Sequence, residues 1–406
     1  MRVLFNAALQ PSHLFPLIPL AWALRAAGHE VRIAHHPSLA PHVQAAGLTS
    51  VVVGSDPRLD AGMREHAQAG GASAGDGGGT GDEENRTFHT RMAVAVFAKA
   101  AASVVDELVS YAEHWRPDLI VFEWQSYAGH LAGEILGIPT VRHLFPGPDL
   151  ASGVPEWRRI ERQSLEALYR EYGVEEVRPD GELTIDPCPP TLGFPAADER
   201  RHRPVRFVAY NGTGQVHEWM LEKPSRPRVA VTVGGTYLWM TGHLSPVGRF
   251  VDALSTLDAE VIAAIPSGTR ELVPEAPDNV RFVENLPLEL FLPDCQLIVN
   301  HGGVGTVATS LVSGVPQVIS PPEAMNYPPF HNAARLTEAG AGARVDENAS
   351  VERIRETIAE VLRDPSYASA ARRISQEAAG RPVPADLVAE LEELAGGPGT
   401  GKRGRA

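Results

Sequence analysis

Two stretches of the chain combine residue types and spacing that could do chemistry, and the first contains a histidine. Residues 12–16 (SHLFP) directly follow the apolar run 3–6. The carboxyl end of a parallel strand in an α/β fold faces the ligand crevice. An imidazole titrates near neutral pH, so it can remove a proton from a hydroxyl group that is otherwise a poor nucleophile. His13 is therefore a candidate general base.

The second stretch is 297–306 (LIVNHGGVGT), where an apolar run meets a group of glycines. A helix is predicted to begin near Val304 and to end at Gly314. Glycine lets the backbone approach a ligand closely, and the unpaired N–H groups of a new helix carry partial positive charge. Such a turn suits a diphosphate. The candidate groups that would bind this anion are His301, Gly302, Gly303, Gly305 and Thr306.

Alternating strands and helices must position these stretches. Apolar residues at 17, 20, 21 and 24 follow a helical period, Gly28 ends that helix, and 31–34 returns to a strand. The further strands that we predict are 118–122, 229–233, 260–264, 280–283 and 296–300. The further helices are near 127–136, 245–257 and 288–292, with a glycine turn at 234–235. This alternation predicts an α/β fold of parallel sheets covered on both faces.

Composition divides the chain into two halves, because Arg, Pro, Gly and Asn dominate 198–227. We expect an N-terminal domain over 1–212, a linker over 213–227 and a C-terminal domain over 228–378. A helix at 379–395 is expected to pack back toward the N-terminal domain, and 396–406 is expected to be a disordered tail. The glycine-rich acidic tract 70–85 is predicted to be a mobile loop. The ligand site is expected in the cleft between the halves.

The bulk composition excludes several classes of partner. A net charge of −14 argues against nucleic acid, which is bound by basic surfaces. No uncharged apolar stretch approaches the ~20 residues that span a bilayer. Two cysteines cannot build a disulfide framework, and no spacing of histidines or cysteines is typical of a metal site. We expect a cytoplasmic protein that has no membrane or nucleic-acid partner and holds no metal.

Several motifs resemble the donor signature of inverting glycosyltransferases. They are HGGVGT at 301–306, GVP at 314–316, NAARL at 332–336 and GAG at 340–342. Residues 19–31 (PLAWALRAAGHEV) are similar to bacterial members that glycosylate antibiotic natural products. The resemblance implies the GT-B fold, in which two Rossmann-like parallel-sheet domains face each other across a cleft. The first domain would bind the acceptor and the second the nucleotide sugar. The resemblance is weakest at 55–115 and 150–200.

The resemblance can be carried to single residues of the donor site. Gly235 and Thr236 match a second contact to the diphosphate. Leu286 matches the residue whose backbone holds the nucleotide base. Asn285 stands where many relatives stack a tryptophan on the base, so the resemblance leaves the base preference open.

The sugar end of the predicted donor site departs from the family pattern. Many relatives bind sugar hydroxyls with an Asp-Gln pair where this chain has Pro328 and Pro329. Proline side chains cannot form hydrogen bonds, so we infer a deoxysugar donor, carried by thymidine diphosphate. Glu323 or Asn326 could bind a remaining hydroxyl. The alternative is that the two prolines only shape a structural turn.

The resemblance also supplies a partner for the candidate base. His13 matches the family's catalytic histidine. The predicted strand 118–122 ends at Glu123, where relatives usually carry an aspartate. A carboxylate there would orient the imidazole through its other ring nitrogen. We interpret His13 as the general base and Glu123 as its partner.

These residues predict an inverting single displacement of a sugar from a nucleotide diphosphate to a hydroxyl of a small hydrophobic aglycone in antibiotic biosynthesis. Apolar residues near 88–97 and 124–145 fit such an acceptor, although core packing explains them equally. No cofactor is expected besides the nucleotide-sugar co-substrate. A homodimer and an auxiliary activator protein stay open as partners.

Three other functions were weighed. A carbon-linking transferase acting on a phenolic ring would use the same base, so nothing in the sequence separates it from oxygen transfer. A non-catalytic nucleotide-sugar-binding or activator protein would be expected to lack His13. A dehydrogenase would need a glycine-rich turn after the first strand, and residues 6–11 contain no glycine.

Overall fold

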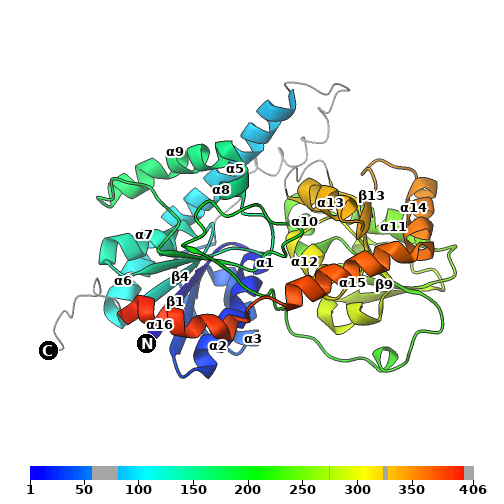
Figure 1. Ribbon diagram of the computed structural model, residues 1–406, viewed down its shortest axis with the longest axis horizontal. Coiled ribbons are helices and arrows are strands. Elements are labelled where there is room, and N and C mark those ends of the chain that lie inside the picture. The colour runs from blue at the N-terminus through cyan, green and yellow to red at the C-terminus, as the bar shows by residue number, and fades with distance from the viewer. Residues whose placement is uncertain (57–80, 274, 323–327, 397–406) are drawn as a thin grey trace.

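The computed structural model describes residues 1–56, 81–273, 275–322 and 328–396, which form two lobes side by side (Figure 1). Within these residues each lobe contains one parallel sheet. The strand orders are β3-β2-β1-β4-β5-β6-β7 in the first lobe and β10-β9-β8-β11-β12-β13 in the second. The predicted α/β fold class with two Rossmann-like parallel sheets is confirmed.

Strand bounds follow the apolar runs of the sequence. The first sheet consists of β1 (Arg2–Ala7), β2 (Glu30–His35), β3 (Thr49–Val52), β4 (Leu119–Glu123), β5 (Thr140–His143), β6 (Leu183–Asp186) and β7 (His202–Pro204). The second consists of β8 (Arg228–Thr232), β9 (Glu260–Ile265), β10 (Val280–Glu284), β11 (Leu297–Asn300), β12 (Gln317–Ile319) and β13 (Gly342–Arg344).

Two neighbouring strands in each sheet determine where the site lies. In the first lobe β1 pairs with β4, so that Phe5 lies opposite Val121. In the second lobe β8 pairs with β11, so that Thr232 lies opposite Asn300. Because the strands are parallel, their carboxyl ends share an edge. The residues that follow β1 and β4 are therefore neighbours, as are those that follow β8 and β11.

Helices cover the first sheet on both faces. They are α1 (Pro11–Leu14), α2 (Ile18–Ala26), α3 (Ala40–Ala45), α5 (Gly81–Ala102), α6 (Val105–Trp115), α7 (Tyr127–Leu136), α8 (Leu150–Gly153) and α9 (Pro155–Glu171). The helix predicted from residues 17–24 is α2, and Leu20, Ala21 and Leu24 pack into the core against the sheet. Burying each such leucine stabilises the lobe by roughly 1.5–3 kcal/mol.

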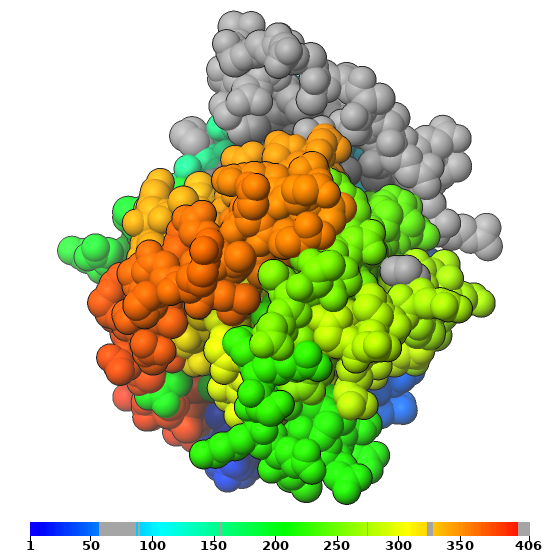
Figure 2. Space-filling view, turned by 90° about the vertical axis from the view of Figure 1, so that its right-hand side faces the viewer, coloured from blue at the N-terminus to red at the C-terminus, as the bar shows by residue number. Residues whose placement is uncertain are grey.

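The second lobe repeats this layering. Its helices are α10 (Gly234–Thr241), α11 (Ser245–Leu254), α12 (Val304–Val312), α13 (Pro329–Glu338), α14 (Val351–Arg363) and α15 (Pro365–Ala379). Figure 2 views this lobe end-on, with the green chain that precedes it lying along its surface. Trp219 and Met220 of that chain pack against a core cluster of the lobe.

The C-terminal segment crosses from the second lobe back to the first. Helix α15 lies on the second lobe, and α16 (Val388–Gly396) lies on the first (Figure 1). Leu387 and Leu391 are buried in the core formed by β1 and α2. None of the helices within the described ranges is long and apolar enough to cross a membrane.

Two local predictions were wrong, and a third was wrong over the part of it that the structure describes. The glycine turn at 234–235 continues at once into α10, because only Gly234 has a positive φ, of 70°, and the residues after it are helical. The helix expected near 288–292 is two short 3₁₀ turns, Leu288–Leu290 and Leu292–Asp294, since Pro293 has no N–H to continue a helix. The loop expected at 70–85 lies outside the described residues up to 80, and from Gly81 the chain is in α5.

Candidate active site

The two lobes enclose a cavity of about 960 Å³. Its lining comes from the carboxyl edges of both sheets and from α5, α8 and α9 of the first lobe, so that residues of the predicted apolar stretch 88–97 line it. Ligands of open α/β sheets bind at this edge. The residues that the sequence singled out are therefore expected to line this cavity.

His13 and Glu123 meet at this edge. His13 lies in α1, a short helix that begins at Pro11, and Glu123 is the last residue of β4. His13 Nδ1 lies 2.9 Å from Glu123 Oε1. A carboxylate only accepts hydrogen bonds, so Nδ1 carries the proton and Nε2 is left as a bare base. His13 lines the cavity, whereas the Glu123 side chain is 1% exposed.

Local hydrogen bonds keep the Glu123 carboxylate in place. Its Oε2 accepts from the Gln125 backbone N–H at 3.1 Å and from Ser126 Oγ at 3.4 Å. The other oxygen is thereby left to His13. Phe97 lies against the imidazole with 5.0 Å between ring centroids. The pair is held in the geometry of a base and its orienting carboxylate.

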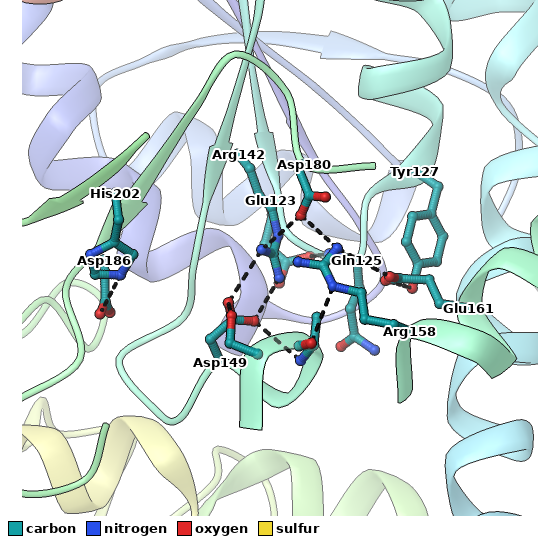
Figure 3. Close-up of polar contacts among 12 residues, drawn as sticks. Glu123, Gln125, Tyr127, Arg142, Asp149, Arg158, Glu161, Asp180, Asp186 and His202 are labelled. Carbon is teal, nitrogen blue, oxygen red and sulfur yellow. Dashed lines mark hydrogen bonds and ion pairs between the residues drawn. The ribbon is translucent and has the colours of Figure 1, made fainter. Parts of the chain in front are cut away.

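Behind this pair lies a partly buried cluster of charged side chains that the sequence did not indicate (Figure 3). Arg142, on β5, pairs with Asp149 at 2.7 Å and with Asp180 at 3.4 Å. Arg158, on α9, also pairs with Asp180 and lies near Glu161. Burial raises the pKa of Asp149, but the Arg142 guanidinium outweighs it and holds that pKa below its usual value. Asp149 therefore stays charged and anchors the loop that carries it.

Asp149 connects the charge cluster to the wall of the cavity. It caps α8 by accepting from the Ala151 N–H, and it also accepts from Ser152 Oγ at 2.6 Å. Residues on both sides of it in the chain form one side of the cavity, which we call the acceptor wall: Phe145, Pro146, Leu150, Gly153, Val154, Glu156 and Trp157. Trp124 stacks on Phe145 at 5.1 Å. This end of the cavity is largely aromatic and aliphatic.

The glycine turn of the second lobe has the predicted strand–turn–helix form. Gly302 has φ +87°, which L side chains rarely adopt, and Gly303 is the N-cap of α12. The free N–H groups of Val304, Gly305 and Thr306 lie at the start of the helix, and all three residues line the cavity. The helix N-terminus is thus available to an anion.

Three buried amide side chains hold this turn, and the sequence analysis did not assign them a role. Asn300 Oδ1 accepts from the Gly302 N–H at 2.7 Å, and Asn300 Nδ2 donates to Gln317 Oε1 at 3.0 Å. Asn332 Nδ2 donates to the Gly302 carbonyl at 2.9 Å. All three side chains are 0% exposed. A polar residue inside the apolar strands β11 and β12 was the available signal.

His301 also lines the cavity. Burial lowers its pKa to about 4, so the ring is neutral at pH 7. Its Nδ1 is enclosed and has no hydrogen-bond partner among the described residues, so the nitrogen available to a ligand is Nε2. A neutral imidazole with its proton on Nε2 can donate one hydrogen bond to a phosphate oxygen.

Gly235 and Thr236 approach the first lobe across the cavity. Both residues lie in the first turn of α10, after β8, and both line the cavity. Thr236 Oγ1 lies 3.2 Å from Ser12 Oγ. The predicted second diphosphate contact therefore sits beside the residue that precedes His13. The two predicted halves of the site face each other.

The remaining predicted donor residues are placed in part. Leu286 is 7% exposed and lines the cavity beside Asn285, whose φ is +48°. Pro328 and Pro329 line the cavity at the start of α13. Glu323 and Asn326 lie outside the described residues. Within the described residues, no group of three or more His, Cys, Asp or Glu side chains could hold a metal ion.

Two facing Rossmann-like lobes, with a histidine–carboxylate pair opposite a glycine turn that suits a diphosphate, define a glycosyltransferase of GT-B fold. Family comparison gives the same class in more detail. The models of the erythromycin biosynthesis protein CIII-like family match residues 22–234 for its N-terminal domain and 248–394 for its C-terminal domain. The chain belongs to this family and is a glycosyltransferase of natural-product biosynthesis.

Characterised relatives align over nearly the whole chain. The chain is 37% identical to TDP-daunosamine transferase DnrS of Streptomyces peucetius, over 97% of both chains. It is 34% identical to aclacinomycin-T 2-deoxy-L-fucose transferase of Streptomyces galilaeus, over 97% of this chain and 96% of that one. The structure of the spinosyn rhamnosyltransferase SpnG complexed with thymidine diphosphate matches with a TM-score of 0.81 and 34% identity, covering 97% of this chain and 100% of that one.

Proposed function

We propose that this enzyme transfers a deoxysugar from thymidine diphosphate to a hydroxyl group of a polyketide-type aglycone, with inversion at the anomeric carbon. The observation that carries the proposal is the His13–Glu123 pair at 2.9 Å in the same cavity as the N-terminus of α12. A base and an anion site on opposite sides of one cavity are what a direct displacement needs.

The proposed reaction is one displacement. His13 Nε2 removes the hydroxyl proton of the acceptor as its oxygen forms a bond to the anomeric carbon. The bond from that carbon to the diphosphate oxygen breaks, and its electron pair leaves with the diphosphate. Backbone N–H groups at 304–306, His301 and the Gly235–Thr236 turn stabilise the negative charge that develops. Attack opposite the leaving group inverts the anomeric configuration.

The donor assignment has two supports. One of the relatives is named for a TDP-sugar, and SpnG has been solved complexed with thymidine diphosphate. In this chain Pro328 and Pro329 line the cavity at the start of α13. Their side chains cannot donate to or accept from a sugar hydroxyl, which favours a sugar with fewer hydroxyl groups. The backbone N–H groups of the glycine turn would stabilise the negative charge of the diphosphate, so the proposed reaction needs no metal ion.

The acceptor assignment rests on the acceptor wall. Its aromatic and aliphatic side chains favour a large apolar ligand, since apolar surface gains free energy when it leaves water. Relatives are named for aklavinone and tylactone, and SpnG has also been solved complexed with spinosyn aglycone. We therefore propose that the acceptor is a polyketide-type aglycone similar in size to these compounds.

The test separates binding from turnover. The melting temperature of wild-type protein is measured with TDP or UDP. Sugar transfer is measured separately, with a panel of TDP-deoxysugars as donors and aklavinone or tylactone as acceptor. Ligands that bind only the folded state raise the melting temperature. The His13→Ala variant should keep the stabilisation by TDP and lose turnover by about 10²–10⁴-fold. His114→Ala, at an exposed position on α6, is the matched control. Turnover by His13→Ala at the control rate would exclude His13 as the base.

A further inference from the structure

A segment that belongs to the first lobe by sequence is built into the second. After β6 the chain runs over residues 187–194. Cys188 and Leu192 of this segment are 1% and 0% exposed, and both lie in a core cluster with side chains of α12, α13 and α15. This burial makes the segment part of the core of the second lobe.

Helix α13 fixes the backbone of the same segment. His331 Nε2 donates to the Leu192 carbonyl at 2.8 Å, and Arg335 Nε donates to the Thr191 carbonyl at 3.0 Å. Helix α13 begins at Pro329, which lines the cavity at the proposed sugar end of the donor site. The segment is therefore tied to the helix that presents Pro329.

Phe194 ends the segment and reaches the acceptor wall. Its ring contacts His331, with 4.8 Å between ring centroids. The same ring lies directly on Gly153, and a Cβ at Gly153 would overlap ring atoms that include Phe194 Cγ. Since Cγ is the ring atom nearest the backbone, a small rotation of the side chain cannot relieve that overlap. Gly153 is the last residue of α8 and lines the cavity.

A second close approach joins Gly147, which follows Phe145 and Pro146 of the acceptor wall, to the donor lobe. A Cβ at Gly147 would lie 2.6 Å from Val304 Cγ1. Val304 is the first residue of α12, the helix whose N-terminus faces the proposed diphosphate. The acceptor wall thus rests on α12 directly and on α13 through Phe194. At both points the absence of a side chain lets the two lobes approach closely.

We infer that Phe194 is a positioning residue that sets the distance between the acceptor wall and the sugar end of the donor site. This inference rests on the proposed function, because it assigns the wall to the acceptor. Phe194 does not touch the reacting atoms. It transmits the position of α13 to Gly153, so the aglycone is seated against a surface whose place depends on the donor lobe.

The test is a double-mutant cycle on Gly153 and Phe194. Gly153→Ala should push the wall out of place and lower kcat/KM for the aglycone by roughly 10- to 100-fold, the scale of a misplacement of about 1 Å. Phe194→Ala should remove the support and lower kcat/KM by about tenfold. Stabilisation by TDP should stay unchanged in both variants, because the glycine turn is not altered. In the double variant the added methyl group no longer meets a ring, so it should be no worse than Phe194→Ala alone.

Gly193→Ala is the matched control. It lies in the same segment, has no positive φ, and its Cβ would meet nothing closer than 3.8 Å. It should keep wild-type kinetics. The inference is overturned if either single variant keeps wild-type kcat/KM, if the two losses multiply in the double variant, or if the response to TDP falls in parallel. Failure of wild-type protein to transfer any sugar would instead refute the proposed function.

Discussion

Replacing the Glu123 carboxylate by an amide tests how the base is oriented. In Glu123→Gln the side chain keeps its shape and loses its charge. The Gln125 N–H and Ser126 Oγ both point at Oε2, so the single amide oxygen is expected to take that place. The amide NH₂ group then faces His13 Nδ1. Because NH₂ only donates there, Nδ1 must accept, and the ring proton moves to Nε2.

The size of the effect follows from that tautomer. With a proton on Nε2, the imidazole can no longer take one from the acceptor hydroxyl. General base catalysis is worth about 10²–10⁴-fold, and the wrong tautomer alone has cost about 10⁴ in other histidine–carboxylate pairs. We expect kcat to fall by about 10²–10⁴, which is roughly 2.7–5.4 kcal/mol at 1.36 kcal/mol per tenfold.

The assay is the initial rate of product formation at saturating donor, measured with the TDP-induced rise in melting temperature on the same samples. Glu123→Asp is the control, since it keeps the charge and shortens the side chain by one methylene. It should retain more activity than Glu123→Gln. If Glu123→Gln works within about threefold of wild type, the carboxylate does not set the tautomer and the reasoning is refuted.

Two further predictions concern the donor turn and pH. Gly303→Ala should weaken TDP binding by about tenfold, or 1.4 kcal/mol, because the new Cβ would overlap the His301 ring. Titration calorimetry measures the dissociation constant of TDP, and Gly380→Ala is the control. Burial lowers the pKa of His130, His143 and His301 to about 4. Between pH 6.5 and 4 the unfolded chain therefore binds more protons than the folded chain, and the free energy of unfolding decreases as the pH is lowered. Each histidine contributes up to about 3 kcal/mol. His130→Gln should flatten denaturation midpoints plotted against pH, and an unchanged curve would contradict this.

The strand–turn–helix form of the proposed donor site could be predicted because it is local in the sequence. Strand, glycine turn and helix follow one another within 297–312, and backbone conformation alone makes that turn suit an anion. His13 and Glu123 are separated by 110 residues, yet His13 lies in the short helix that follows β1 and Glu123 ends β4 of the same parallel sheet. The sequence does not show that β1 and β4 are neighbours in the sheet, and the structure shows that they pair.

The supports of the donor turn could be predicted less well. Asn300, Gln317 and Asn332 are polar residues with fully buried side chains, and sequence alone does not say which buried amides meet. Two of their hydrogen bonds join residues that are 17 and 30 positions apart. Leaving one of their polar groups unpaired costs about 1–3 kcal/mol, and among the described residues Asn332 Oδ1 has no hydrogen-bond partner. Only the packing of α13 against the turn reveals which of these groups meet.

The acceptor wall could be predicted only in part, because the apolar stretch 124–145 includes Phe145 of the wall but does not indicate where in the fold the wall lies. The position of the acceptor wall is determined by contacts between residues that are far apart in the sequence. One set of contacts lies within the first lobe and the other faces the second lobe. In its own lobe it is fixed by Arg142 and Asp149, a buried pair that costs more to desolvate than an apolar core would. Toward the other lobe it is fixed by Phe194 on Gly153. Removing one partner of a buried pair typically costs 3–5 kcal/mol, so this arrangement favours one position of the wall over others. The shape of the cavity available to an acceptor is therefore determined partly by Arg142, Asp149 and Phe194, which do not line the cavity. The lining residues alone do not reveal this contribution.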